Sequence, residues 1–124
     1  MKKITFVLIC LLLVLAACAP TTPSNPDQTI ETGAGKSFQI IIDANPTTGY
    51  HWEIVGELDK NVVEFVGKDY QSASQPGLVG GGGVDIWTFK AVAAGETKIT
   101  LGYYPPSNTA TDPAQTETFT VVVK

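Results

Sequence analysis

The chain has 124 residues, which is enough for one domain with its own hydrophobic core and too few for two. It carries 8 Lys, no Arg and 12 acidic residues, which gives a formal charge of −4 at pH 7. This balance argues against nucleic-acid binding, because contacts to phosphates depend on clustered basic residues.

The first 17 residues have the pattern of an export signal. A basic Lys2-Lys3 pair precedes an apolar run from Ile4 to Ala17, and this run is shorter than the roughly 20 residues that a membrane-spanning helix needs. The Leu15–Cys18 segment resembles a bacterial lipobox, in which the Cys is acylated and becomes the first residue of the mature protein. The resemblance implies that Cys18 carries lipid. A plain signal peptide with an incidental Cys is the alternative.

Removal of residues 1–17 changes the composition of the chain that remains. It leaves 107 of the 124 residues and takes the formal charge from −4 to −6, because Lys2 and Lys3 are lost. Cys18 is then the only cysteine, so neither a disulfide nor a Cys-based metal site can form. We expect an exported monomer in the cell envelope, lipid-anchored to a membrane that faces the periplasm or the exterior.

Residues 18–29 are predicted to be the lipidated Cys and a flexible tether, because they hold three prolines and almost nothing apolar. The folded domain is predicted to span residues 30–124. Its Thr and Val content, with Gly, Pro and Asn at short intervals, is typical of an all-β protein. No segment has a helical apolar period.

Alternation of apolar and polar residues predicts about seven strands. They lie at residues 28–32, 37–43, 50–55, 62–66, 84–92, 97–103 and 116–124, and the fourth continues unevenly to Tyr70. Regular short strands with turn-rich connections favour an immunoglobulin-like sandwich of two antiparallel sheets.

Few residues in this sequence support catalysis or metal binding. The Gly33–Ser37 segment lacks the first glycine of a phosphate-binding loop, and a strand follows it instead of a helix. His51 is the only imidazole, so we expect an exposed strand residue there and neither a zinc site nor a hydrolytic triad. A carboxylate pair for sugar hydrolysis stays open, although nothing selects one. The sequence favours a binding module without cofactor or metal over an enzyme.

Three connections between the predicted strands emerge at one end of an immunoglobulin-like sandwich. The first loop, Asn45–Tyr50, combines a proline of fixed φ with a glycine that tolerates positive φ, which favours a stiff, protruding turn. The second loop, residues 71–83, ends in Gly80–Gly83, and the third loop, residues 105–114, begins with Pro105-Pro106-Ser107. Considered separately, the first loop could be no more than a favourable turn and the second no more than a flexible tip. The three loops at one end of the sandwich together favour a binding surface.

These loops resemble those of the chagasin-type inhibitors of papain-like cysteine peptidases, and the resemblance extends from Phe38 to Val123. The first loop, with Trp52 after it, is similar to the family's Asn-Pro-Thr-Thr-Gly-aromatic motif, which is the most specific match. Gly80–Gly83 is similar to its Gly-x-Gly-Gly loop. The third loop differs, because Pro105-Pro106-Ser107 stands where the family has Arg-Pro-aromatic.

The resemblance implies inhibition by shape. The Thr47-Thr48-Gly49 turn would enter the active-site cleft beside the catalytic Cys–His pair without presenting a peptide in cleavable register. The glycine loop would lie along one side of the cleft, and the start of the third loop would brace the other. The peptidase-binding residues expected on this basis are Asn45, Pro46, Thr47, Thr48, Gly49, Tyr50, Gly80, Gly82, Gly83, Tyr104, Pro105 and Pro106.

The changed third loop leaves a second interpretation open. In this interpretation the domain belongs to a non-inhibitory surface lipoprotein that serves envelope assembly, adhesion or glycan binding. A peptidase assay distinguishes the two, because only an inhibitor lowers the activity of a papain-like enzyme.

Overall fold

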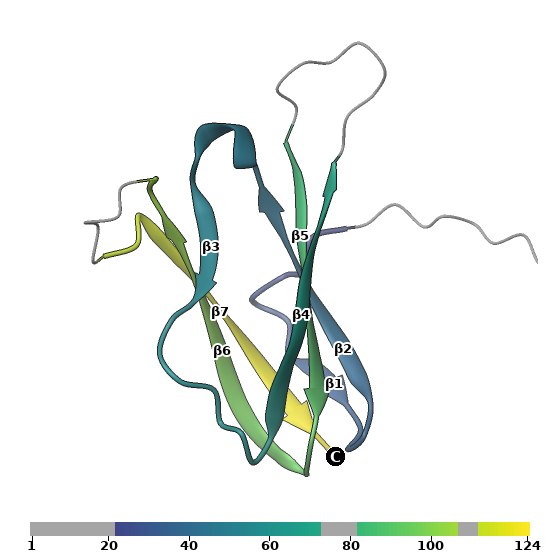
Figure 1. Ribbon diagram of the computed structural model, residues 1–124. Coiled ribbons are helices and arrows are strands. Elements are labelled where there is room, and N and C mark those ends of the chain that lie inside the picture. Colours follow the sequence, from purple (N-terminus) through teal and green to yellow (C-terminus); the bar gives the residue numbers. More distant parts are fainter. Residues whose placement is uncertain (1–21, 73–81, 107–111) are drawn as a thin grey trace, which may run out of the picture.

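The structure is a computed structural model that describes residues 22–72, 82–106 and 112–124 (Figure 1). Cys18, Gly80 and Ser107 therefore lie outside the described residues. The strands are β1 (Ile30–Thr32), β2 (Ser37–Ala44), β3 (His51–Ile54), β4 (Val63–Ser72), β5 (Gly83–Ala91), β6 (Gly95–Tyr104) and β7 (Gln115–Val123). A short 3-10 helix, η1 (Pro46–Thr48), joins β2 to β3. No helix in the described part of the chain is long and apolar enough to cross a membrane.

Two sheets face each other, one with the strand order β1-β7-β6-β3 and the other with the order β2-β5-β4 (Figure 1). The predicted sandwich is confirmed, with one difference: β1 pairs with β7 in parallel, whereas the other pairs are antiparallel. The turn at Gly33–Lys36, closed by a hydrogen bond from Lys36 N to Gly33 O (3.1 Å), carries the chain from one sheet to the other. Consequently β1 lies beside β7 and not beside β2.

The core fills the space between the sheets with one apolar face from each. Side chains alternate inward and outward along a strand, so the inward set follows directly from the sequence pattern. Many of these inward-facing residues are 5% exposed or less: Ile40, Trp52, Val63, Trp87, Phe89, Ala91, Ile99, Leu101, Phe119, Val121 and Val123. The apolar faces predicted for strands two, three, five, six and seven are the ones that pack together.

Truncation of Phe119 to Ala is expected to lower the free energy of unfolding by about 3–5 kcal/mol, because the ring is fully buried and leaves a cavity. Truncation of Val92, which is 43% exposed, is the matched control and should change it by less than about 0.5 kcal/mol. Denaturant unfolding of both variants measures the difference. Equal losses would contradict the assignment of Phe119 to the core.

The fourth strand continues past Val66, as expected, and ends at Ser72, two residues beyond the predicted end at Tyr70. Phe65 pairs with Phe89 and Gly67 pairs with Thr88, so Val66 is an extra residue that forms a β-bulge. A bulge shifts the alternation by one position, which hides the second half of β4 from a period-two pattern. The shift also returns Lys68 to the inward side of the sheet.

Part of the predicted tether contacts the domain. Ser24 N donates to Ile41 O (2.7 Å), and Ile41 N donates to the Ser24 hydroxyl oxygen (3.0 Å). Ile41 belongs to β2, which is an edge strand with unpaired main-chain groups on its outer side. Residues around Ser24 satisfy two of these groups, so the packed part of the chain begins before residue 30.

Candidate functional site

The three loops that the sequence singles out lie at the same end of the sandwich (Figure 1). Gly83 pairs with both Ala44 and Ser72, so the end of the second loop lies beside the start of the first. His51 pairs with Tyr104, so the first loop ends where the third begins. The connections from β2 to β3, β4 to β5 and β6 to β7 therefore form one surface.

The first loop is exposed and is held in shape by its own hydrogen bonds. The Asn45 carboxamide oxygen accepts hydrogen bonds from the main-chain N–H of Thr47 (3.2 Å) and from the Thr47 hydroxyl. The Thr48 hydroxyl donates to Asn45 O (2.8 Å) and accepts from Tyr50 N (3.3 Å). Gly49 has a φ of 80°, a left-handed conformation that favours glycine. The turn is thus preformed, which lowers the entropy cost of binding.

The third loop supports the first. A Cβ atom on Gly49 would lie 2.9 Å from Cβ of Pro106, so the two loops touch at the position where Gly49 has no side chain. Below this contact the Tyr103 ring stacks on Tyr50, with 5.1 Å between ring centroids, and packs against Trp52 at 4.8 Å. Pro106 therefore keeps a packing role even though the residues on either side of it differ from the family's motif.

The second loop returns to the sandwich through Gly82 and Gly83. A Cβ on Gly83 would meet Gln71 O, the Tyr70 hydroxyl (2.7 Å) and Ser72 Cα (2.9 Å), so only glycine allows β4 and β5 to close here. A Cβ on Gly82 would meet Ala44 O at 3.2 Å, a milder contact. Because these two glycines have no side chains, the end of the second loop can lie against the base of the first.

A Gly83→Ala substitution is expected to lower the melting temperature by several degrees, since overpacking of this kind costs about 1–3 kcal/mol. Gly82→Ala is the control and should shift it less, because the neighbouring atoms are farther away. Thermal unfolding of both variants measures the effect. A shift for Gly82→Ala that matches or exceeds the one for Gly83→Ala would contradict the close approach of β4 at Gly83.

A pocket of about 700 Å³ opens at this end of the sandwich. Its lining includes Asn45 and Trp52 beside the first loop, Gly82 and Gly83 at the end of the second loop, and Pro23 of the N-terminal segment. Pro23 of the N-terminal segment thus lines the same pocket as residues of the loops, an arrangement that the sequence does not predict.

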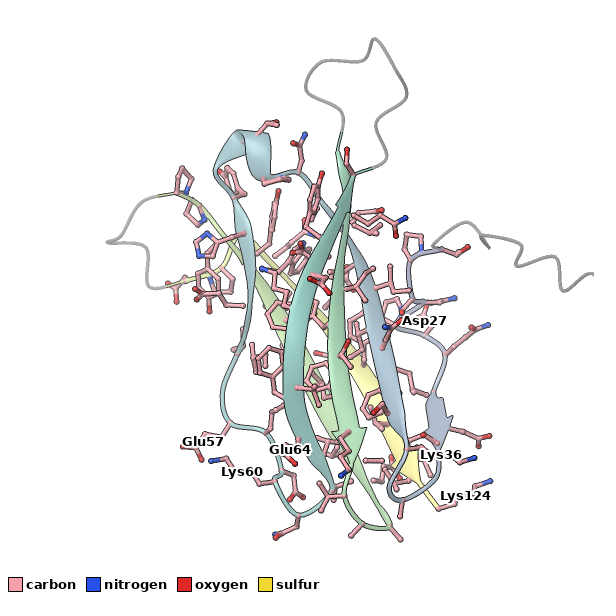
Figure 2. The ribbon with its side chains drawn as sticks, turned by 45° about the vertical axis from the view of Figure 1, so that its right-hand side comes forward. Asp27, Lys36, Glu57, Lys60, Glu64 and Lys124 are labelled. Carbon is pink, nitrogen blue, oxygen red and sulfur yellow. The ribbon has the colours of Figure 1, made fainter. Side chains whose placement is uncertain are left out.

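Several charged side chains lie at the end of the sandwich opposite the three loops. Figure 2 shows Lys36, Glu57, Lys60, Glu64 and Lys124 around the end of the sandwich that lies away from the three loops. These positions serve as controls for substitutions at the loops.

His51 lies on the exposed face of β3, as predicted, with its Nε2 atom 3.2 Å from Glu53 Oε1. Within the described residues, no group of three or more His, Cys, Asp and Glu side chains is placed to hold a metal ion.

Residues 31–123 match the model of the family described as "Chagasin family peptidase inhibitor I42". The chain belongs to the chagasin family. It is a peptidase inhibitor of this family and not an enzyme. The resemblance inferred from the loop motifs is confirmed, and the family match favours inhibition over the non-inhibitory interpretation.

The match to the chagasin family extends to individual proteins. Amoebiasin-1 of Entamoeba histolytica is 36% identical over 86 residues, which cover 68% of this chain and 80% of that protein. The crystal structure of the cysteine protease inhibitor EhICP2 from Entamoeba histolytica has a TM-score of 0.61 and 25% identity, covering 79% of this chain and 90% of that one. The ICP of Leishmania mexicana has a TM-score of 0.56 and 29% identity over 86% and 96% of the two chains.

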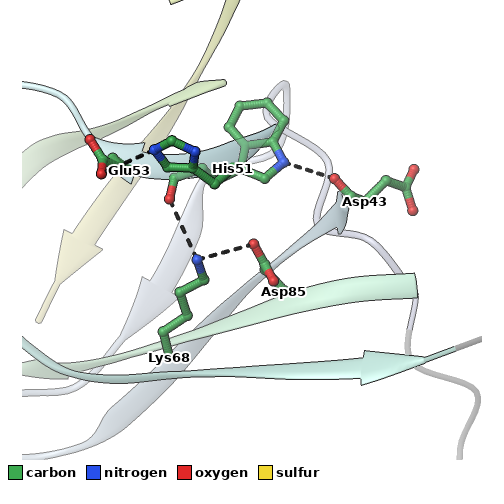
Figure 3. Close-up of polar contacts among 6 residues, drawn as sticks. Asp43, His51, Glu53, Lys68 and Asp85 are labelled. Carbon is green, nitrogen blue, oxygen red and sulfur yellow. Dashed lines mark hydrogen bonds and ion pairs between the residues drawn. The ribbon is translucent and has the colours of Figure 1, made fainter. Parts of the chain in front are cut away.

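The structure brings most of the predicted site residues together. Those that it describes at the loop end are Asn45, Pro46, Thr47, Thr48, Gly49, Tyr50, Gly82, Gly83, Tyr104, Pro105 and Pro106. Sequence reasoning missed Lys68 and Asp85, which lie beneath the loops (Figure 3). A signal for Asp85 exists in the sequence, because it is a charged residue on the apolar face that Trp87 and Phe89 continue.

Proposed function

We propose that this chain inhibits papain-like cysteine peptidases by placing the first loop in the active-site cleft, with the second and third loops on either side. The observation that carries the proposal is the preformed, exposed turn at Pro46–Thr48, flanked by the other two loops on a domain of the chagasin family. EhICP2, a solved relative, is a cysteine protease inhibitor.

The shape of the first loop explains how a peptidase could be blocked without cutting the inhibitor. Pro46–Thr48 is helical and Gly49 is left-handed, so the turn does not offer an extended peptide to the nucleophile. Its internal hydrogen bonds would have to break before it could extend. The turn therefore fills the cleft as a fixed wedge.

The third loop of this chain contributes to peptidase binding in a different way from a loop that carries the family's Arg-Pro-aromatic motif. Arg and aromatic residues dominate interface energies, and here Pro105 and Ser107 take their places. Pro106 contacts Gly49, so we propose that the third loop acts mainly by supporting the first loop. Binding energy then comes chiefly from the first and second loops.

Protection of the catalytic cysteine tests this mode of inhibition. A papain-like peptidase is treated with iodoacetamide in the presence and absence of a saturating amount of the full chain. We expect alkylation of the catalytic thiol to slow at least tenfold when the chain is bound, because the first loop covers that thiol. Inhibition of substrate cleavage with unchanged alkylation would show that the chain binds elsewhere.

We also propose that Cys18 anchors the inhibitor to a membrane of the producing cell, with residues 19–21 between the lipid and the described domain. The support is the Leu15–Cys18 pattern behind a short apolar leader. Labelling with a palmitate analogue in a bacterial host tests this, with Cys18→Ser as the control. Incorporation that depends on Cys18 supports the anchor, and equal incorporation in the control, or none in either chain, contradicts it.

A further inference from the structure

One charged side chain is buried beneath the loops. Asp85 is 6% exposed and, among the described residues, is the one polar or charged residue in the buried class. It occupies an inward position on β5, two residues after Gly83, with Trp87 and Phe89 following on the same face. A buried carboxylate is costly unless it is paired, so the contacts of Asp85 identify what it does.

The partner of Asp85 is Lys68, which reaches inward from β4. Lys68 Nζ lies 3.5 Å from Asp85 Oδ2 and 5.0 Å from the centre of the Trp87 ring. It also donates a hydrogen bond to Trp52 O (3.5 Å), which belongs to β3 in the opposite sheet (Figure 3). Lys68 therefore provides one polar connection between the two sheets.

Trp52 extends this network to the base of the first loop. Its indole Nε1 donates to Asp43 O (2.8 Å), so a hydrogen bond connects the strand that enters the first loop to the strand that leaves it (Figure 3). Lys68 and Asp85 lie on β4 and β5, the strands that enter and leave the second loop. One chain of contacts thus links all four strands that carry these two loops.

We propose that Lys68 and Asp85 are positioning residues that hold the first loop in a fixed place relative to the second. Apolar packing between sheets is non-directional and tolerates small displacements, whereas an ion pair with a directed hydrogen bond to Trp52 O selects one arrangement. Asp85 is buried and the Lys68 side chain is one-third exposed. An ion pair with a buried member adds little stability compared with an apolar pair of the same shape, so stability alone does not account for it. The proposal rests on the proposed inhibition of cysteine peptidases.

The first test separates positioning from stability. The double variant Lys68→Met/Asp85→Leu replaces both charged side chains with apolar ones of similar size, so its melting temperature should stay close to that of the wild type. The single variant Lys68→Met leaves Asp85 without its partner and should melt at a lower temperature. We expect the double variant to inhibit a papain-like peptidase at least tenfold more weakly than the wild type in spite of its stability.

The matched control is a pair at the other end of the sandwich. Glu31 and Lys124 form an exposed ion pair at 3.8 Å, away from the three loops. Glu31→Gln/Lys124→Met should leave inhibition unchanged. If the Lys68/Asp85 double variant is stable and inhibits as well as the wild type, the positioning role is refuted.

A second readout does not depend on inhibition. In 15N relaxation measurements on the wild type, the amides of Thr47, Gly49 and Gly83 are expected to be as rigid as those of β2 and β5. In the Lys68/Asp85 double variant we expect exchange broadening of these amides and faster hydrogen exchange of the Trp52 indole N–H. Broadened loop amides in the wild type, or unchanged relaxation in a folded double variant, would overturn the proposal.

The inhibition assay and the relaxation measurements distinguish a failure of the proposed function from a failure of the positioning role. A wild-type chain that fails to inhibit any papain-like peptidase contradicts the proposed function, while the relaxation data still decide whether Lys68 and Asp85 order the loops. A wild-type chain that inhibits, together with a double variant that does so equally well, contradicts the positioning role alone.

Discussion

Replacement of Thr48 by Asp is expected to weaken inhibition of a papain-like peptidase by about a hundredfold or more. The Thr48 hydroxyl donates to Asn45 O and accepts from Tyr50 N, whereas an ionised Asp only accepts. The substitution therefore breaks a bond that shapes the turn and adds a charge that the bound peptidase would bury. A buried, unpaired charge costs about 3–5 kcal/mol, which corresponds to this loss.

Thr48→Ser is the matched control, because serine keeps the hydroxyl that makes both hydrogen bonds. Its inhibition constant should stay within about fivefold of the wild type. Steady-state assays of the two variants against one peptidase give the comparison, and thermal unfolding checks that both are folded. A folded Thr48→Asp variant with wild-type potency would show that the first loop does not enter the interface.

Replacement of Gly49 by Ala is expected to have the second largest effect. A left-handed φ of 80° costs a residue with a side chain about 1–2 kcal/mol, and the added Cβ would also lie 2.9 Å from Pro106 Cβ. The turn must therefore change shape or move away from the third loop. We expect the inhibition constant to rise at least about tenfold, since the wedge is no longer preformed.

Gly56→Ala separates the effect of backbone strain from the effect on the site. Gly56 has a φ of 75°, and a Cβ there would meet no atom within 4 Å. It follows β3, outside the three loops, so the variant should lose a similar part of its stability through strain and keep its inhibition. Equal inhibition constants for the Gly49 and Gly56 variants would contradict the contact between Gly49 and Pro106 as a determinant of binding.

The sequence was sufficient to predict the strands that have one clearly apolar and one more polar face. Phe38, Ile40 and Ile42 share one face of β2, and Ser37, Gln39 and Asp43 lie on the other face with Ile41. Phe119 likewise stands between two threonines in β7, so the period of two shows both the strands and their inward faces. The first loop was predictable for a related reason: Pro46 and Gly49 restrict the backbone locally, and the structure has the expected turn. Local chemistry determines these features.

Features that depend on distant parts of the chain were not predictable. The uneven second half of β4 was expected, but its cause, the bulge at Val66 that interrupts the alternation, was not. The parallel pairing of β1 depends on which sheet has a free edge, and the contact of Ser24 with Ile41 depends on where β2 lies. The pairing of Lys68 with Asp85 depends on the same bulge, which turns Lys68 toward the core. Each of these features forms only in the assembled sandwich, so the local sequence does not predict it.

Titration of a papain-like peptidase with the full chain tests the central claim most directly. We expect reversible, competitive inhibition at a ratio of one chain to one active site, with the Asn45–Tyr50 segment intact after prolonged incubation. The Thr48→Asp variant should fail in the same assay. No inhibition of any papain-like peptidase at micromolar concentrations of folded chain, or inhibition accompanied by cleavage within the first loop, would contradict the claim that this turn blocks the cleft by its shape.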